Sequence, residues 1–302
     1  MEYDLTVILG PTASGKTKFA VKMAAETGGE IISADSRQVY RKMDIGTGKD
    51  LQEYLYNGIA VPYHLIDIVD AGTKYNLFEY KSDFINAYND ILSRDKKPIL
   101  CGGTGLYIEA VTKGYDLPEV PPDKALREEL ERLSMEELIS RLSGLKKLHN
   151  TTDLDNKKRA IRAIEIALYE QKSPEREEYH TEGALDSAEK REKNVPPLNC
   201  KFIGLSVDRD ERNRRIDARL KYRLENGMVE EVKSLIESGI SPEDLIYYGL
   251  EYKFVTLYLI GELTFAEMER QLAIAIHQFA KRQMTWFRGM ERRGISIEWV
   301  AI

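Results

Sequence analysis

The sequence predicts an α/β fold in which helices flank a parallel sheet, with a small all-helical domain inserted into it. Short apolar runs typical of buried strands alternate along the chain with segments of helical apolar spacing, which favours parallel strands joined by helices. After residue 122 this alternation stops, and the next stretch shows helical periods only. Because a strand pattern returns near residue 200, we expect a core domain over 1–120 and 200–302, interrupted by a helical domain over 121–199.

The first part of the chain supplies three strand patterns and two helix patterns. Residues 5–9 form a β-prone apolar run, residues 16–26 carry apolar side chains at helical spacing, and residues 30–34 resume as a second strand. A helix is predicted over 78–94 and a third strand over 98–102. Parallel sheets bind ligands at the carboxyl ends of their strands, so the loops after these three strands are the expected site.

The rest of the chain is predicted to be mainly helical. Residues 134–137 have the spacing of a capping box, and residues 154–169 form a helical stretch. Residues 170–199 are rich in Glu, Lys, Ser and Pro, which predicts a mobile loop within the inserted domain. A buried strand returns over 202–207, and a second capping box at 264–267 begins another helix.

Composition excludes several classes of protein. The 302 residues are 31% charged and 42% hydrophobic, which is too balanced for a disordered or fibrous chain. The only cysteines, Cys101 and Cys200, stand far apart, so neither a disulfide framework nor a structural zinc site is plausible. No apolar run approaches the ~18 residues of a membrane span and the N-terminus lacks a secretion pattern, so we expect a cytoplasmic protein with no membrane partner.

Residues 10–17 match the phosphate-binding loop pattern of Gly, four residues, Gly, Lys and Ser or Thr. Gly15 lets backbone N–H groups approach phosphate oxygens, Lys16 adds a positive charge, and the Thr17 hydroxyl is suited to bind Mg²⁺. The strand pattern before the loop and the helix pattern after it argue against a chance match. The sequence therefore predicts a P-loop NTPase-like fold whose diphosphate-binding residues are Gly10, Pro11, Thr12, Ala13, Ser14, Gly15, Lys16 and Thr17.

The third strand lacks the acid that nucleotide hydrolases usually carry there. An Asp at that position normally holds Mg²⁺ opposite the phosphate-binding loop, but this strand ends in Cys101 followed by two glycines. That weakens an ATPase interpretation. The best-placed carboxylate is then Asp35, at the tip of the second strand, which could accept a proton from a nucleophile. The alternative is that Asp35 only caps a helix or a turn.

Basic residues gather in three places, within 157–162, 209–223 and 281–293. Taken singly, each cluster could be a solvated helix face. The net charge of −6 argues against a uniformly basic nucleic-acid binder, but electrostatic footprints are local. Three basic clusters in an acidic protein therefore favour a polyanionic partner.

Seven stretches occur in an order and spacing that is far more specific than any one of them. They are Gly10-Pro-Thr-Ala-Ser-Gly-Lys-Thr17, Ser33-Ala-Asp-Ser-Arg-Gln-Val-Tyr40, Met43-Asp-Ile-Gly-Thr47, Tyr63-His-Leu-Ile-Asp67, Gly102-Gly-Thr-Gly-Leu-Tyr107, Arg159-Ala-Ile-Arg-Ala-Ile-Glu165 and Gln278-Phe-Ala-Lys-Arg-Gln-Met-Thr-Trp-Phe-Arg288. With them the chain resembles the tRNA dimethylallyltransferases, also called tRNA isopentenyltransferases, along nearly its whole length. Without a zinc-finger extension, it resembles the shorter bacterial members.

This resemblance implies transfer of a dimethylallyl group from dimethylallyl diphosphate to N6 of adenosine 37 in tRNAs that read codons beginning with U. By motif position Asp35 matches the family's general base, and Thr104 matches a residue close to the reacting centre. Lys16, Thr17 with Mg²⁺, and either Arg215 or Arg219 would stabilise the negative charge that grows on the departing diphosphate. Such a displacement needs no water-activating acid on the third strand.

The resemblance also implies that the anticodon stem-loop of tRNA binds and that the target base leaves its stack to enter the protein. Ser36, Arg37 and Gln38, together with Asp35 and Thr104, match the segment around the flipped base. Contacts to the stem-loop are expected from Arg127, Lys158, Arg159, Ala160, Ile161, Arg162, Lys281 and Arg282. We expect the chain to act on this RNA as a monomer.

Three other functions stay open at this point. Phosphate-binding loops most often hold ATP, so a small-molecule kinase is one alternative, and an adenylate isopentenyltransferase acting on free nucleotides is another. A third is a non-catalytic RNA-binding protein that uses the loop only as an anion site. Two segments, Gly46-Thr-Gly-Lys-Asp50 and Tyr247-Tyr-Gly-Leu-Glu-Tyr252, depart from the family's pattern without removing a proposed catalytic group.

Overall fold

The computed structural model describes residues 3–114, 120–145, 156–172 and 198–302. The chain divides into two compact units. The first is formed by Met1–Tyr115 together with Lys193–Ile302, and the second by Asp116–Glu192. The polypeptide therefore leaves the first unit, builds the second, and returns to complete the first.

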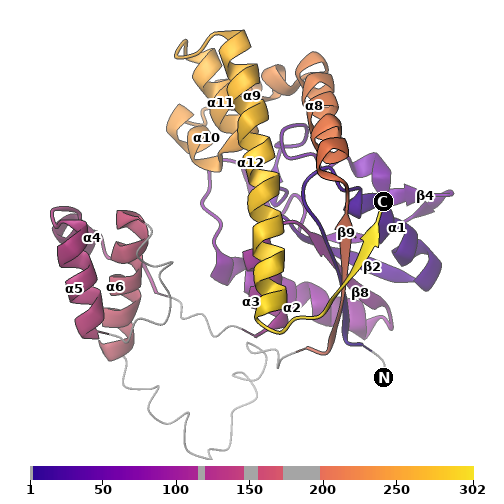
Figure 1. Ribbon diagram of the computed structural model, residues 1–302, viewed down its shortest axis with the longest axis horizontal. Helices are drawn as coiled ribbons and strands as arrows, with labels where there is room; N and C mark the ends of the chain where they lie inside the picture. The colour runs from indigo at the N-terminus through magenta and orange to yellow at the C-terminus, as the bar shows by residue number, and fades with distance from the viewer. Residues whose placement is uncertain (1–2, 115–119, 146–155, 173–197) are drawn as a thin grey trace, which may run out of the picture. The chain divides into compact units, whose positions relative to one another are not determined.

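The first unit is built on a six-stranded sheet in which every neighbouring pair of strands is parallel. The strand order is β10-β9-β1-β8-β2-β6, which confirms the predicted α/β class; β9, β8 and β2 are labelled in Figure 1. The two edge strands, β10 and β6, were not predicted from the sequence. The strands are β1 (Leu5–Leu9), β2 (Gly29–Ala34), β6 (Tyr63–His64), β8 (Lys97–Gly102), β9 (Cys200–Ser206) and β10 (Ile297–Ala301).

Helices cover both faces of the sheet because side chains alternate along each strand. On β1, Ile8 packs with Ala20 and Val21 of α1, whereas Val7 and Leu9 pack on the opposite face with α2, α3 and α12. The predicted capping box at 264–267 is present at the start of α12. The helices of this unit are α1 (Lys16–Thr27), α2 (Leu77–Ser93), α3 (Gly105–Thr112), α8 (Arg209–Glu225), α9 (Met228–Glu237), α10 (Pro242–Tyr248), α11 (Leu250–Leu259) and α12 (Phe265–Arg292).

Two small two-stranded sheets lie between β2 and α2 in the sequence. One pairs β3 (Tyr40–Arg41) with β7 (Val69–Asp70), and the other pairs β4 (Leu55–Tyr56) with β5 (Ile59–Ala60). A 3-10 helix, η1 (Leu51–Tyr54), leads into β4. Of these elements, η1 and β4 pack against α1, and several residues of the segment after β2 line a cavity.

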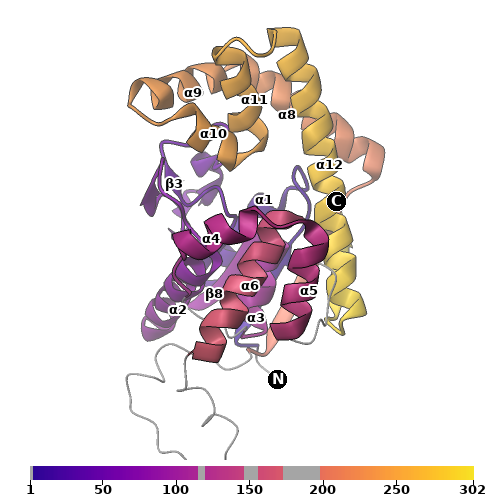
Figure 2. The same ribbon diagram turned by 90° about the vertical axis from the view of Figure 1, so that its left-hand side faces the viewer.

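The described part of the second unit consists of α4 (Lys124–Glu131), α5 (Met135–Leu145) and α6 (Lys157–Lys172), which pack on one another as Figure 2 shows. The predicted capping box is formed: Ser134 N donates to Glu137 Oε2 at 2.7 Å, and Glu137 N donates to Ser134 Oγ at 3.2 Å. Of the loop predicted over 170–199, residues 170–172 belong to α6, and 173–197 lie outside the described residues. Among the helices that the structure describes, none is long and apolar enough to cross a membrane.

Candidate active site

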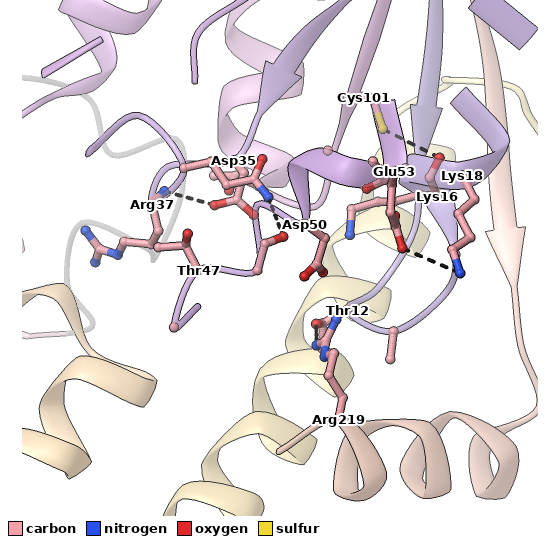
Figure 3. Close-up of a pocket in the computed structure, with 18 of the residues that line it drawn as sticks. Thr12, Lys16, Lys18, Asp35, Arg37, Thr47, Asp50, Glu53, Cys101 and Arg219 are labelled. Atoms are coloured by element: carbon pink, nitrogen blue, oxygen red, sulfur yellow. Dashed lines mark hydrogen bonds and ion pairs between the residues drawn. The ribbon is translucent and has the colours of Figure 1, made fainter. Parts of the chain in front are cut away.

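The carboxyl ends of three adjacent strands bring distant loops together. In the register of the sheet, Gly102 of β8 lies beside Leu9 on β1 and beside Ala34 on β2. A Cβ atom on Gly102 would lie 2.2 Å from the Ala34 carbonyl oxygen, so only glycine permits this approach. A cavity of about 1180 Å³ opens at this edge, and residues from the loops after all three strands line it (Figure 3).

The loop after β1 has the backbone expected of a phosphate-binding loop. Gly15 has a φ of 76°, a left-handed conformation that favours glycine, and α1 begins at the next residue. From α12, Gln283 fixes the loop, because its Oε1 accepts from Thr12 N at 2.8 Å while its Nε2 donates to the Gly103 carbonyl at 2.9 Å. One amide side chain therefore ties the loop after β1 to the loop after β8.

Two polar groups of this loop have no hydrogen-bond or ion-pair partner among the described residues. The Ser14 hydroxyl is fully buried and makes no hydrogen bond with any described residue. Lys16 lines the cavity, where burial lowers the pKa of its ammonium group, and it forms no ion pair within the described parts of the chain. An unpaired cation and an unpaired hydroxyl at a helix N-terminus form a site that suits an anion.

Asp35 stands at the tip of β2 and faces the same cavity. Its Oδ1 accepts from Arg37 N at 2.9 Å, so it does cap a turn, as the alternative interpretation held. The carboxylate forms no ion pair with the described residues, which leaves Oδ2 available to a ligand. Thr104 lies beside it: Thr104 N donates to the Ala34 carbonyl at 3.1 Å, and Thr104 Oγ1 accepts from Ser36 N at 3.2 Å.

Helix α8 contributes the arginines that the sequence left unresolved. Arg219 donates to the Thr12 hydroxyl of the phosphate-binding loop, and burial, followed by the charge of Arg223, lowers the pKa of Arg219 to about 10. Arg215 also lines the cavity, but its Nε donates to Glu211 on the same helix at 2.8 Å. Arg219 is therefore the arginine that reaches the loop, and Arg215 is held by a neighbouring carboxylate.

Sequence reasoning missed Glu231, which fixes the loop over residues 44–46 beside the cavity. The carboxylate of Glu231, on α9, accepts hydrogen bonds from the backbone of residues 44–46: from Asp44 N at 2.8 Å, Ile45 N at 2.7 Å and Gly46 N at 3.1 Å. It also accepts from the Tyr252 hydroxyl at 2.7 Å. The next residues, Thr47 and Gly48, line the cavity. Only the three-dimensional fold brings this acid to the loop, which lies 185 residues away from it at Gly46.

Glu231→Ala is expected to lower the free energy of unfolding by about 2 kcal/mol, because three backbone N–H groups lose a charged acceptor. Urea unfolding measures the change. The matched control is Glu230→Ala, which removes an exposed acid from the same helical turn and should have little effect. Equal effects of the two variants would contradict a role of Glu231 in fixing the loop.

A second acid that sequence reasoning missed is Glu251, near the start of α11. It lines the cavity, and its burial raises the pKa of the carboxyl group, partly opposed by Arg223 and Arg219. The chain turns into this helix through Gly249 at a φ of 76° and Leu250 at a φ of 39°. The available signal was the departure of residues 247–252 from the family's pattern.

The residues predicted around a flipped base all line the cavity, as does one of the two α12 residues predicted to contact the stem-loop. Arg37 and Thr104 line the cavity with Ser36. Gln38 also lines it, but both ends of its amide are engaged, since Oε1 accepts from Ser33 Oγ at 3.1 Å and Nε2 donates to the Gly48 carbonyl at 3.1 Å. On α12, Lys281 and Arg282 are exposed, and Arg282 also lines the cavity.

The residues predicted to contact RNA from the second unit differ in their exposure. Lys158 and Arg159 are exposed on α6, whereas Ala160 and Ile161 are buried in the three-helix core, so their side chains do not face solvent. The other two, Arg127 and Arg162, both bind the buried carboxylate of Glu165. Arg127 does so through Nε at 2.9 Å and Nη2 at 2.8 Å.

A parallel sheet with this loop after β1 defines a protein of the P-loop type, and comparisons with known proteins identify the family. The family model for IPP transferase matches residues 38–290, and that for isopentenyl transferase matches residues 3–60. The chain belongs to the tRNA dimethylallyltransferase family, whose members are prenyltransferases. The resemblance inferred from the seven stretches is confirmed.

Individual relatives match over nearly their whole length. The chain is 57% identical over 299 residues to tRNA dimethylallyltransferase 1 of Parabacteroides distasonis, which covers 99% of this chain and 92% of the relative. It is 58% identical over 299 residues to tRNA dimethylallyltransferase 2 of Bacteroides fragilis, with 99% and 93% covered.

Solved structures agree with the fold. The tRNA isopentenylpyrophosphate transferase of Bacillus halodurans has a TM-score of 0.68 at 33% identity, covering 99% of this chain and 90% of that protein. A eukaryotic dimethylallyltransferase, solved in crystallographic snapshots of its action on tRNA, has a TM-score of 0.76 at 24% identity, with 98% and 73% covered. At that identity the likeness extends to the fold alone.

Proposed function

We propose that this chain transfers a dimethylallyl group from dimethylallyl diphosphate to N6 of adenosine 37 in tRNAs that read codons beginning with U, releasing diphosphate. The observation that supports this most is one cavity that joins the phosphate-binding loop to the Asp35 carboxylate. At the end of β8, Cys101 stands where a hydrolase has an acid, and burial raises the pKa of its thiol to about 12. A neutral thiol cannot replace the carboxylate that a nucleotide hydrolase uses.

In the proposed reaction, the N6 amine attacks the first carbon of the dimethylallyl group. The N6–carbon bond forms, the carbon–oxygen bond breaks, and its electron pair leaves with diphosphate. Asp35, through the oxygen that does not cap the turn, accepts the proton released by N6. Lys16 and Arg219, which line the same cavity, stabilise the charge on the leaving group.

The residues present also fit Mg²⁺. Hard cations prefer oxygen ligands, and the cavity is lined by the Thr17 hydroxyl and by the carboxylates of Asp50 and Glu53. The buried Ser14 hydroxyl lies in the same loop without a partner. We propose that Thr17 holds Mg²⁺ together with diphosphate oxygens, where the ion would neutralise charge on the leaving group.

Exposed basic side chains support binding of the tRNA backbone. In the proposal, Lys158 and Arg159 of the second unit and Lys281 and Arg282 of the first contact phosphates of the anticodon stem-loop. Substrates of this kind place the reaction in the cytoplasm. We propose that a single copy of the chain carries it out.

Arg159→Ala should weaken binding of an anticodon stem-loop and reduce the salt dependence of that binding by a slope of about 1, because one phosphate contact is lost. Binding titrations at several salt concentrations measure both. The matched control is Arg127→Ala, which breaks a bidentate pair with buried Glu165 and should instead destabilise the second unit by about 1–3 kcal/mol. Unchanged RNA binding by Arg159→Ala would contradict the proposed contact between this face of α6 and the RNA.

The direct test is incubation of the protein with labelled dimethylallyl diphosphate and an unmodified tRNA that reads a codon beginning with U, followed by nucleoside analysis. Label on the adenosine at position 37 is the expected result. Reaction with AMP but not with the stem-loop would indicate an adenylate isopentenyltransferase. Phosphoryl transfer from ATP without any use of the prenyl donor would indicate a kinase, and RNA binding without label transfer would indicate a non-catalytic protein.

A further inference from the structure

Arg37 and Tyr248 line the cavity, and a second tyrosine, Tyr247, stands beside them just outside the cavity lining. The Arg37 guanidinium carbon lies 5.9 Å from the centre of the Tyr247 ring and 5.6 Å from that of Tyr248. Tyr248 packs on buried Tyr40, with the ring centres 4.6 Å apart, and its hydroxyl accepts from Gly72 N at 2.7 Å. The inner tyrosine is therefore held rigidly, and it supports the arginine beside it.

The outer tyrosine has no such constraint. Tyr247 is 57% exposed, and no hydrogen bond of its hydroxyl joins it to the described residues. Exposed aromatic rings beside a functional cavity supply flat surfaces for other planar groups. Tyr247 lies on α10, and the next residue of that helix, Tyr248, is buried. The sequence thus places the first ring of the pair in solvent and the next one in the core.

Arg37 is also unusual in having no acidic partner. Its side chain forms no ion pair with the residues that the structure describes, although its backbone N–H binds Asp35 at 2.9 Å. In the view of Figure 3, the guanidinium lies on the opposite side of Asp35 from Lys16. The backbone of Arg37 thus binds the carboxylate proposed as the base, while its guanidinium lies against the two tyrosines.

We propose that Tyr247 and Arg37 together form a stacking platform for a nucleobase that neighbours the target adenosine in the RNA loop. This inference rests on the proposed function. Both groups present planar faces that stack on any base, and the arginine adds attraction to the RNA backbone. They act as positioning residues: they hold the loop so that the extruded adenosine reaches Asp35.

The chemistry of the platform favours RNA over the prenyl donor. The dimethylallyl group is small and apolar, and its diphosphate requires the cations at the Lys16 end. An unpaired guanidinium beside an exposed aromatic ring instead matches an unstacked base with its phosphate, which is how proteins recognise single-stranded loops. The absence of the platform should therefore alter RNA binding and leave donor binding unchanged.

The test places fluorescent 2-aminopurine in turn at each position beside the target adenosine in an anticodon stem-loop. The parent protein should quench it at one position, Tyr247→Phe and Tyr247→Trp should quench it equally, and Tyr247→Ala should not. Tyr247→Ala should also weaken stem-loop binding by about 5- to 150-fold, the range for one stacked base. The control Tyr222→Ala removes a ring on α8 that is 64% exposed and has no contact with Arg37 among the described residues, and it should change binding by about twofold at most.

A nucleotide without a base at the quenched position should weaken binding to the parent by the same factor and barely affect binding to Tyr247→Ala. If no position is quenched, or if no base deletion weakens binding to the parent, the platform does not exist; neither result depends on a variant that folds. Turnover of the stem-loop by the parent separates the two proposals. If the parent does not turn over the stem-loop, the proposed function is contradicted. If the parent turns it over normally and Tyr247→Ala binds the stem-loop as tightly as the parent does, only the platform is contradicted.

Discussion

Asp35→Asn is expected to lower turnover by about 10²–10⁴-fold while changing RNA affinity little, because the substitution removes a general base and keeps the shape of the side chain. The carboxamide oxygen of Asn can still accept the hydrogen bond from Arg37 N, so the turn after β2 should stay intact. Single-turnover assays with the stem-loop and labelled donor measure the rate, and binding titrations measure the affinity.

Two further variants separate catalysis from the cap. Asp35→Ala removes both functions and should add a loss of stability to the same loss of rate. Asp95→Asn makes the same chemical change in an exposed turn outside the cavity, where a φ of 54° already suits Asn, and should leave the rate unchanged. Should Asp35→Asn turn over like the parent, the carboxylate would be a turn cap and nothing more.

Sequence patterns predicted correctly those elements that depend only on residues close together in the chain. The loop over 10–17 and the strands beside it depend on glycines and apolar runs that lie within a few residues of one another. The edge strands β6 and β10 were missed because a two-residue strand has no periodicity, and because Ile297–Ala301 pairs only on one side, with β9. Edge strands take their structure from the neighbour rather than from their own sequence.

The connections between loops could not be predicted in the same way. Thr12 N donates to Gln283 Oε1, which lies 271 residues further along the chain. Glu231 reaches residues 44–46 only because α9 folds over them. A motif can name a side chain's chemistry, but the group that orients it depends on which helix packs beside it. The same applies to Arg127, which the family resemblance matched to an RNA contact and whose guanidinium binds Glu165.

The two arginines of α8 illustrate this limit most clearly. Both are basic, both line the cavity, and they lie one helical turn apart. The sequence alone could not choose between them as partners of the leaving group. In the fold Glu211 binds Arg215, while Arg219 reaches Thr12.

Arg219→Met should therefore lower turnover by about 10²–10³-fold, whereas Arg215→Met should stay within about fivefold of the parent, because a partly exposed ion pair contributes little. A larger loss of turnover in Arg215→Met than in Arg219→Met would indicate that Arg215 binds the leaving group. Although Arg219→Met should lower the rate, it should not lower the stability of the protein. Burial lowers the pKa of Arg219 to about 10, so at neutral pH the folded protein holds this charge at a cost, and the melting temperature of Arg219→Met should not fall.

The pH dependence follows from the same burial. Burial lowers the pKa of Lys16 as well as that of Arg219, so both groups lose their charge earlier than exposed side chains as pH rises. In the parent, kcat/KM should fall as pH approaches 10, because the free enzyme then loses the cations that hold the diphosphate. Saturating donor should shift that fall to higher pH, since the bound anion favours the protonated forms. A profile that stays flat through pH 10 would contradict a lowered pKa for the cations that hold the diphosphate.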